Sequence, residues 1–228
     1  MLTLSASWET AYPDVAVGIL AMEHVSNPAH HAALDALKSG LETSLRARFA
    51  GLDRAQLRSL PVLKAYHAYY RRFKKTYHVQ LQLESIVLHG KPVLSEAALV
   101  EAMFMAELKN QLLTAGHDLD AVRLPLRGEV ATGEESFTRI NGQEQQLKPG
   151  DLMICDAVGP LSTVIYGPDR RTQITPATHR VLFTVYGAPG IPPSALGDHL
   201  LDLESNVRII APQAVVAERH VYAPTEPV

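Results

Sequence analysis

Cysteine is scarce in this chain: Cys155 is the only one among 228 residues. A single thiol excludes an intrachain disulfide and a cysteine-based zinc site. Cys155 follows the strand-like apolar run Leu152-Met153-Ile154. We therefore expect a buried structural thiol rather than a nucleophile, because a reactive thiolate needs a partly exposed, electropositive setting.

An excess of positive charge is also missing. The chain has 21 lysines and arginines against 24 aspartates and glutamates, and its formal net charge is −3. Proteins that bind polyanions indiscriminately are normally basic overall, so this class is disfavoured. A local basic patch remains open.

Long apolar runs are absent from the sequence as well. The first residues, Met1-Leu2-Thr3-Leu4-Ser5, contain no basic stretch followed by a long apolar one, so we expect no secretory signal. No apolar run approaches the roughly 20 residues that span a bilayer. We expect a cytoplasmic protein without a membrane partner.

Helical patterns fill the first half of the chain after one strand, expected at residues 14–22. Asn27 and Pro28 look like the cap and first residue of a helix, and Ser95 looks like the cap of a later one. Glycines at 51, 90 and 116 offer helix ends. The expected helices are residues 28–49, 53–57, 61–75, 80–89 and 96–114.

Strand patterns begin near Val122 and continue to Tyr186. Asn141-Gly142 between alternating flanks predicts a hairpin, and a second turn is expected at 167–169. A last helix is expected at 194–204, capped by Ser194, and the proline-broken tail 223–228 should fray. Helices followed by strands predict an α+β fold, with an antiparallel or mixed sheet packed against several helices in a single compact domain.

Basic and aromatic residues alternate in the expected helix 61–75. Helical spacing sorts them into a basic stripe beside an apolar stripe that contains Tyr66, Tyr70 and Phe73. One interpretation is a face that holds phosphates and stacks on unpaired bases. The other is an amphipathic helix with tyrosines in the core and a solvated basic side. The phosphate-binding candidates here are Lys64, Arg71, Arg72, Lys74 and Lys75.

Two polar residues share a side of the expected helix 96–114 with apolar ones. Burying Glu107 and Asn110 without partners would cost a few kcal/mol. They either line a polar pocket or bond to neighbouring backbone. Downstream, Asp156 either ties loop amides or serves a site. Arg170 and Arg171 crowd a tight turn, where they either bind an anion or pair with Asp169.

Short motifs in fixed order carry a family resemblance over roughly residues 60–190. The chain is similar to the B3/B4 domain, which phenylalanyl-tRNA synthetase carries in its β subunit and which also occurs as free-standing proteins. The motifs are Tyr70-Arg71-Arg72-Phe73, His117-Asp118-Leu119-Asp120, Gly133-Glu134-Glu135, Asn141-Gly142, Lys148-Pro149-Gly150-Asp151, Gly159-Pro160 and Tyr166-Gly167-Pro168-Asp169.

The resemblance implies a site and a partner. In the synthetase domain an editing pocket binds a misattached amino acid, and water hydrolyses its ester. His117 and Thr178 fall at positions of that pocket, whereas Val158 stands where the family has a recognition glutamate. The resemblance implies a B3/B4-like core at 60–190, with a strand and helices before it (1–59) and a helix and tail after it (191–228) in the same unit.

Two functions remain open from the sequence. The first is binding of tRNA or aminoacyl-tRNA, with a trans-acting hydrolase of misacylated tRNA as its enzymatic version. The second is a pocket for an amino-acid-like small molecule, without RNA. The pocket candidates are Glu107, Asn110, His117, Asp156 and Thr178. No metal or other cofactor is expected, because the histidines are scattered. No aminoacylation core is recognisable.

Overall fold

The computed structural model describes residues 1–224; the end of the tail expected to fray, 225–228, lies outside them. The described helices are α1 (Ala6–Ala11), α2 (Ala32–Arg48), α3 (Arg54–Ser59), α4 (Pro61–Arg72), α5 (His78–His89), α6 (Ala98–Asn110) and α7 (Pro193–Ile210). The strands are β1 (Leu2–Leu4), β2 (Val17–Glu23), β3 (Leu113–Asp118), β4 (Leu126–Val130), β5 (Ser136–Thr138), β6 (Glu144–Gln146), β7 (Leu152–Cys155), β8 (Pro160–Thr163), β9 (Gly167–Pro168), β10 (Arg180–Tyr186) and β11 (Val215–Tyr222).

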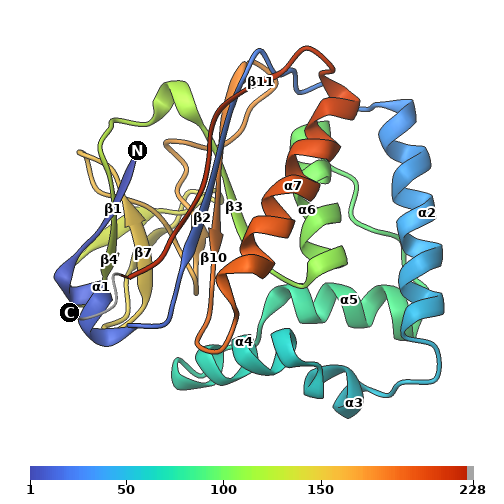
Figure 1. Cartoon of the computed structure of the whole chain (residues 1–228), viewed down its shortest axis with the longest axis horizontal. Coiled ribbons are helices and arrows are strands. Elements are labelled where there is room, and N and C mark those ends of the chain that lie inside the picture. Colours follow the sequence, from blue (N-terminus) through green and yellow to red (C-terminus); the bar gives the residue numbers. More distant parts are fainter. Residues whose placement is uncertain (225–228) are drawn as a thin grey trace.

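The elements form layers around a central antiparallel sheet (Figure 1). This sheet has the strand order β11-β2-β10-β3. Helices α6 and α7 cover one side of it, and a second sheet, β1-β4-β7-β8-β9, lies on the other. Strand β1 pairs with β4 in parallel, so the second sheet is mixed. The expected α+β class, with antiparallel and mixed sheets packed against helices, is confirmed.

The core lies on both faces of the central sheet. Strand β2 is buried at six consecutive positions, and β10 is buried from Val181 to Tyr186. A strand with one wet face would alternate instead, so these runs reflect cover on both sides. Strands from the beginning, middle and end of the chain thus share one core.

The expected hairpin at Asn141-Gly142 is confirmed. Strands β5 and β6 pair in antiparallel register on either side of it. Gly142 has a φ of 84°, and its N–H donates to the Arg139 carbonyl at 2.8 Å. Glycine adopts this left-handed backbone conformation without steric cost. Residues 127–186, all of them described, contain no helix, as expected.

Helix α6 ends earlier than expected, and the residues behind it form a strand. It stops at Asn110, because Gln111 adopts a left-handed conformation with a φ of 63°. Residues 113–118 then pair with β10 as β3. The expected helix to residue 114 was wrong, since pairing with a buried neighbouring strand outweighs weak helical periodicity. His117 therefore lies on a strand.

The expected helix caps at Asn27, Ser95 and Ser194 were also wrong. Helix α2 begins at Ala32, and the Asn27 side chain instead accepts from the Leu99 N–H at 2.9 Å. The Ser95 hydroxyl accepts from the Lys38 ammonium at 3.2 Å. Pro192 precedes α7 in the cap position. In the first two cases the polar side chain bonds to a distant segment rather than to its own helix.

Two further differences concern the second half of the chain. The second turn lies at 164–166, before the expected one, and Gly167-Pro168 already belong to the returning strand β9. Helix α7 continues to Ile210, and the segment after it forms β11, which pairs with β2. The β11 segment carries the adjacent polar residues Glu218, Arg219 and His220, and the sequence analysis had assigned no structure to it.

Candidate functional site

A cavity of about 180 Å³ lies beside helix α6, where the edges of the two sheets meet. Its walls come from α6, β3, β9 and β10, and its apolar lining includes Met103, Phe104, Leu113, Ala115, Pro168 and Ile174. The wall residues His78 and Phe104 are not fully buried, so the cavity reaches the surface beside them. A cavity of roughly 150 Å³ accepts a benzene molecule. This one has room for a small aromatic or branched aliphatic group.

Glu107 contributes the carboxyl group of the cavity wall. Glu107 is 1% exposed, and its Oε1 accepts a hydrogen bond from the Thr114 N–H at 2.7 Å. Its Oε2 is buried and has no hydrogen-bond partner. Burial raises the pKa of Glu107 to about 8, against the opposing effect of the Thr114 hydrogen bond. At pH 7 the carboxyl is therefore mostly protonated, and its Oε2 is free to bond.

His117 belongs to a buried hydrogen-bond network next to this cavity. Its Nδ1 lies 2.8 Å from Thr172 Oγ1, and its Nε2 lies 3.2 Å from Ser162 Oγ. Thr172 in turn donates to Asp169, and Ser162 bonds at 2.7 Å to the hydroxyl of Tyr186, a wall residue. Burial lowers the pKa of His117 to about 3, so the ring is neutral. Through Ser162, this network contacts Tyr186 of the cavity wall.

Asp156 ties a loop together. Its carboxylate accepts the backbone N–H groups of Arg123, Val158 and Gly159 and two guanidinium N–H groups of Arg171, at 2.8–3.1 Å. Burial opposes ionisation, but the Arg123 amide and the Arg171 guanidinium hold the pKa of Asp156 below its ordinary value. The sequence analysis left two interpretations open for Asp156. These contacts fit the one in which its carboxylate ties loop amides together.

Thr178 and Asn110 lie away from the cavity wall. The Thr178 hydroxyl donates to Asp118 Oδ2 at 2.8 Å. The Asn110 amide donates to Asp202 Oδ2 of α7, also at 2.8 Å. Of the five pocket candidates, the structure places Glu107 on the cavity wall and the other four in contacts within the protein. It does not bring the five together around one concave site.

Basic residues of α4, of the turn just after it and of the loop before β7 form a surface that we call the basic face: Lys64, His67, Arg71, Arg72, Lys74 and Lys148. Two hollows of about 590 Å³ and 460 Å³ lie on this surface and meet at Arg72. Among the described residues, none that lines either hollow carries a carboxylate. Burial and then the cations Arg58 and Arg71 lower the pKa of His67, as expected where positive charge accumulates.

The tyrosines of α4 face inward. Tyr66, Tyr69 and Tyr70 are each at most 2% exposed. Tyr69 donates to Asp151 Oδ1 at 2.8 Å, and Tyr70 donates to the Val164 carbonyl at 2.6 Å. Their rings are part of the core and are not available for stacking on bases. The helix is amphipathic, with the basic stripe exposed and the tyrosines buried.

Arg72 belongs to the basic face but also makes contacts within the protein. Its guanidinium carbon lies 5.4 Å from the Tyr12 ring centroid and 5.6 Å from those of Tyr69 and Phe73. Its Nη1 also donates to the Tyr12 hydroxyl at 3.0 Å. Cation–π contacts of this kind contribute to stability. Arg72 therefore packs against aromatic rings although its residue is exposed, and Lys64 and Arg71 are exposed as well.

Lys75 lies between the basic face and the cavity. Its Nζ is 5.8 Å from the centroid of the Tyr166 ring. Tyr166 directly precedes Gly167 and Pro168, which line the cavity, and His78 on the same wall is three residues after Lys75. Lys75 thus directly follows Lys74 of the basic face and lies three residues before a residue of the cavity wall.

The two arginines of the turn at 170–171 differ in their surroundings. Arg171 pairs with Asp156 at 3.0 Å and with Asp169 at 3.4 Å, so its charge is compensated. Arg170 is exposed and lines another hollow of about 410 Å³, together with Val158. Val158, which the resemblance places at a glutamate position, is 66% exposed and is not part of the cavity wall.

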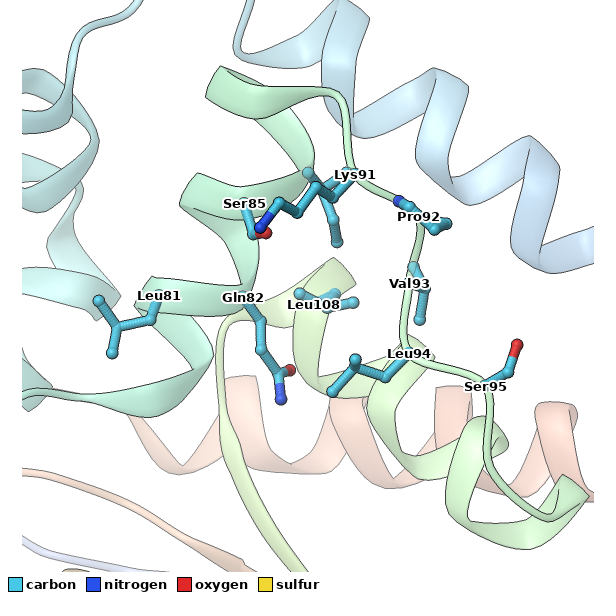
Figure 2. Close-up of a pocket in the computed structure, with 10 residues that line it drawn as sticks. Leu81, Gln82, Ser85, Lys91, Pro92, Val93, Leu94, Ser95 and Leu108 are labelled. Carbon is cyan, nitrogen blue, oxygen red and sulfur yellow. The ribbon is translucent and has the colours of Figure 1, made fainter.

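A further groove of about 530 Å³ lies between α5 and the segment that follows it (Figure 2). Leu81, Leu94 and Leu108 lie around it, with Gln82, Ser85 and Lys91 at its polar positions. Leu81 and Leu94 are 43% and 55% exposed. The groove and the two hollows of the basic face share no lining residue.

Within residues 1–224, no three histidine, cysteine or acidic side chains cluster so that they could hold a metal ion. Cys155 is buried, and burial raises the pKa of its thiol to about 12. Both properties fit the structural thiol predicted for it. No helix in the described part of the chain combines the length and the apolar character needed to cross a membrane.

The sequence analysis missed several residues of these surfaces. Thr114 and Tyr186 belong to the cavity wall, and Lys148 belongs to the basic face. Lys148 stands in the motif Lys148-Pro149-Gly150, which could have drawn attention to it. Thr114 and Tyr186 carried no such signal, because only the pairing of β3 with β10 brings them to one wall.

Comparison with known proteins gives consistent matches. The model of the B3/4 domain matches residues 66–192. The phenylalanine–tRNA ligase beta subunits of Mycoplasma genitalium and Mycoplasma pneumoniae are each 29% identical over 69 residues, 30% of this chain but 9% of the subunit. A crystal structure of an N-terminal fragment of the phenylalanyl-tRNA synthetase beta subunit from Pyrococcus horikoshii superposes with a TM-score of 0.46 and 12% identity, over 96% of this chain and 54% of that one.

Proposed function

The chain belongs to the B3/4 domain family, and from this membership we propose that it binds tRNA, in particular aminoacyl-tRNA. The phosphate backbone would lie on the basic face, and the aminoacyl group would enter the cavity beside Glu107. The matched relatives are named as subunits of a tRNA ligase. The match covers less than a tenth of their length. That tRNA is the partner of this chain is therefore our own proposal.

The observation that carries the proposal is the basic face. Its two hollows meet at Arg72, and the exposed residues Lys64 and Arg71 line the larger of these two. Lysine and arginine side chains that neutralise phosphates supply most of the sequence-independent affinity for nucleic acids. The formal charge of −3 is compatible with this role, because lysines and arginines gather on this face and, among the described residues, no carboxylate lines its two hollows.

The cavity supports the aminoacyl part of the proposal. Its 180 Å³ suits the side chain of an amino acid, and Lys75 lies between it and the basic face. The enzymatic version of the function is hydrolysis of a misacylated tRNA at this cavity, with water as the nucleophile. No residue is assigned as its catalyst.

A second candidate is an amino-acid-like small molecule bound without RNA. The observation in its favour is the same cavity, which has a largely apolar lining and a carboxyl with one free oxygen. This function would need the cavity but not the basic face, so variants of the two surfaces separate the candidates.

The proposal is tested by measuring the affinity of the full chain for tRNA at several salt concentrations. We expect measurable binding at low salt that weakens as salt rises, because counterions are released on binding. Arg71→Ala should weaken it, whereas Lys91→Ala, an equal charge change beside the groove of Figure 2, should not. No measurable affinity at low salt would overturn RNA binding and leave the small-molecule candidate.

A further inference from the structure

The cavity wall offers an incoming group a buried hydrogen-bonding atom that has no partner. Within residues 1–224, Glu107 Oε2 is the one cavity-wall side-chain oxygen or nitrogen that is both buried and unpaired. The side chains of the other buried polar wall residues are engaged: Thr114 Oγ1 lies 2.8 Å from His199 Nε2, Thr163 Oγ1 accepts from the Tyr166 N–H at 3.0 Å, and the Tyr186 hydroxyl bonds to Ser162. His78, also on the wall, is an exposed residue. A buried oxygen left without a partner is unfavourable, so a ligand that satisfies it is favoured.

The direction of that hydrogen bond follows from the partner of the other oxygen. Glu107 Oε1 accepts from the Thr114 N–H at 2.7 Å and so is the acceptor end of the carboxyl group. The proton of the neutral acid then belongs on Oε2, which can donate it. An ionised carboxylate would instead require a cation or a donor in a cavity that is otherwise apolar, which is costly.

We propose that the cavity takes a small, neutral, mainly apolar group that bears one oxygen acceptor, and that Glu107 selects this group by donating a hydrogen bond from Oε2. This inference rests on the proposed function only in that the group is there the side chain of the aminoacyl moiety. It assigns to Glu107 the role of a specificity-determining residue.

The test uses two molecules of nearly equal shape, anisole and ethylbenzene, of which only anisole has an oxygen acceptor. Both are neutral at every pH used, and both approach the size that a cavity of this volume admits. Binding to the full chain is followed by NMR titration at about pH 6 and about pH 9.5, on either side of the Glu107 pKa. A net hydrogen bond is expected to favour anisole by roughly fivefold at the lower pH.

Two variants provide the matched comparison. Glu107→Gln keeps an acceptor for Thr114 and a donor in place of Oε2, so its preference for anisole should persist at both pH values. Glu107→Met removes the donor and should bind the two molecules equally. The wild type should lose its preference at the higher pH, where the carboxylate only accepts.

The other titratable groups near Glu107 are His78 on α5, His199 on α7, Tyr186 on β10, and Tyr66, Tyr70 and Tyr77 beneath α6. They are unchanged in Glu107→Gln. A pH effect that remains in this variant therefore belongs to them and not to Glu107.

The inference is overturned if wild type binds neither molecule, if it shows no preference at the lower pH, or if Glu107→Gln loses the preference along with the carboxyl. Should Glu107→Met fail to fold, the contrast in pH dependence between wild type and Glu107→Gln still decides. Both measurements are independent of RNA. A protein that prefers anisole but has no tRNA affinity would retain this inference and refute the proposed function, and the reverse result would do the opposite.

Discussion

The backbone N–H of Thr114 donates to Glu107 Oε1 at 2.7 Å, seven residues along the chain, and this bond joins the last turn of α6 to the first residues of β3. This bond gives a hydrogen-bond partner both to a buried carboxyl group and to a backbone amide of the strand. The same contact leaves Glu107 Oε2 buried at the cavity wall without a hydrogen-bond partner. A structural bond and a binding group thus share one side chain.

Glu107 should make the stability of the protein depend on pH. Its folded-state pKa, about 8, lies above the ordinary value of 4.5. Between these values the folded state binds more protons than the unfolded state, so stability falls as pH rises through this window and levels off above it. The loss should reach about 5 kcal/mol, at 1.36 kcal/mol for each pKa unit.

The measurement is the free energy of unfolding from urea titrations between about pH 5 and pH 9, compared between wild type and Glu107→Gln. The difference between the two proteins should favour the Gln variant increasingly as pH rises. Asp151, another buried carboxyl whose burial raises its pKa to about 6, contributes equally to both and cancels. A difference that does not change with pH would contradict the prediction.

The buried ion pair of Lys38 and Glu101 should be costly to break on one side. The Lys38 ammonium lies 2.9 Å from Glu101 Oε1, and the two side chains are 11% and 2% exposed. Lys38→Met leaves the carboxylate buried without its cation and should cost roughly 3 kcal/mol. The double variant Lys38→Met/Glu101→Leu should recover most of that loss in thermal unfolding. A double variant less stable than Lys38→Met would contradict this account.

Tyr70 should matter more through its ring than through its hydroxyl. The ring is 2% exposed, and its hydroxyl donates to the Val164 carbonyl at 2.6 Å. Tyr70→Ala should lower the free energy of unfolding by roughly 3–5 kcal/mol, as for a large core aromatic residue. Tyr70→Phe should cost only about 1 kcal/mol, the net value of a hydrogen bond. Equal losses in denaturant titrations would show that the hydroxyl, not packing, dominates.

Arg71 and Arg72 should separate RNA binding from stability, although they are neighbours on one helix. Arg71→Ala should lower tRNA affinity and reduce the slope of log affinity against log salt by about 1, with unchanged stability. Arg72→Ala should in addition destabilise the fold, by about 1 kcal/mol, because its guanidinium packs over Tyr12, Tyr69 and Phe73. If both variants unfold at the wild-type temperature, the packing role of Arg72 is refuted.

The absence of a side chain at Gly116 should leave the cavity wide enough for a ligand. A Cβ at this position would lie 2.7 Å from Ile174 Cδ1 and 3.2 Å from Met103 Sδ, both on the cavity wall. Gly116→Ala should therefore narrow the cavity and weaken the binding of both anisole and ethylbenzene in NMR titrations, with tRNA affinity from the basic face retained. Unchanged aromatic binding would place these molecules elsewhere, for example in the groove of Figure 2.

Local sequence determined a large part of this fold. The Asn141-Gly142 turn, the absence of helix from 127 to 186 and the amphipathic character of α4 all follow from short-range periodicity and turn chemistry, which act over a few residues. The basic stripe was recognisable for the same reason, because positions three and four residues apart share one face of a helix. The burial of Cys155 was likewise evident from its apolar neighbours.

Only the tertiary structure decided β3, β11 and the cavity. Residues 113–118 and 215–222 become strands because β10 and β2 offer them unpaired backbone groups, and such pairing is invisible in a local window. Glu107 and Asn110 lie three residues apart on one helix, yet one lines the cavity and the other bonds to Asp202. Sequence spacing gives the face of a helix, but the element packed against each part of that face determines whether a polar side chain meets a partner or a cavity.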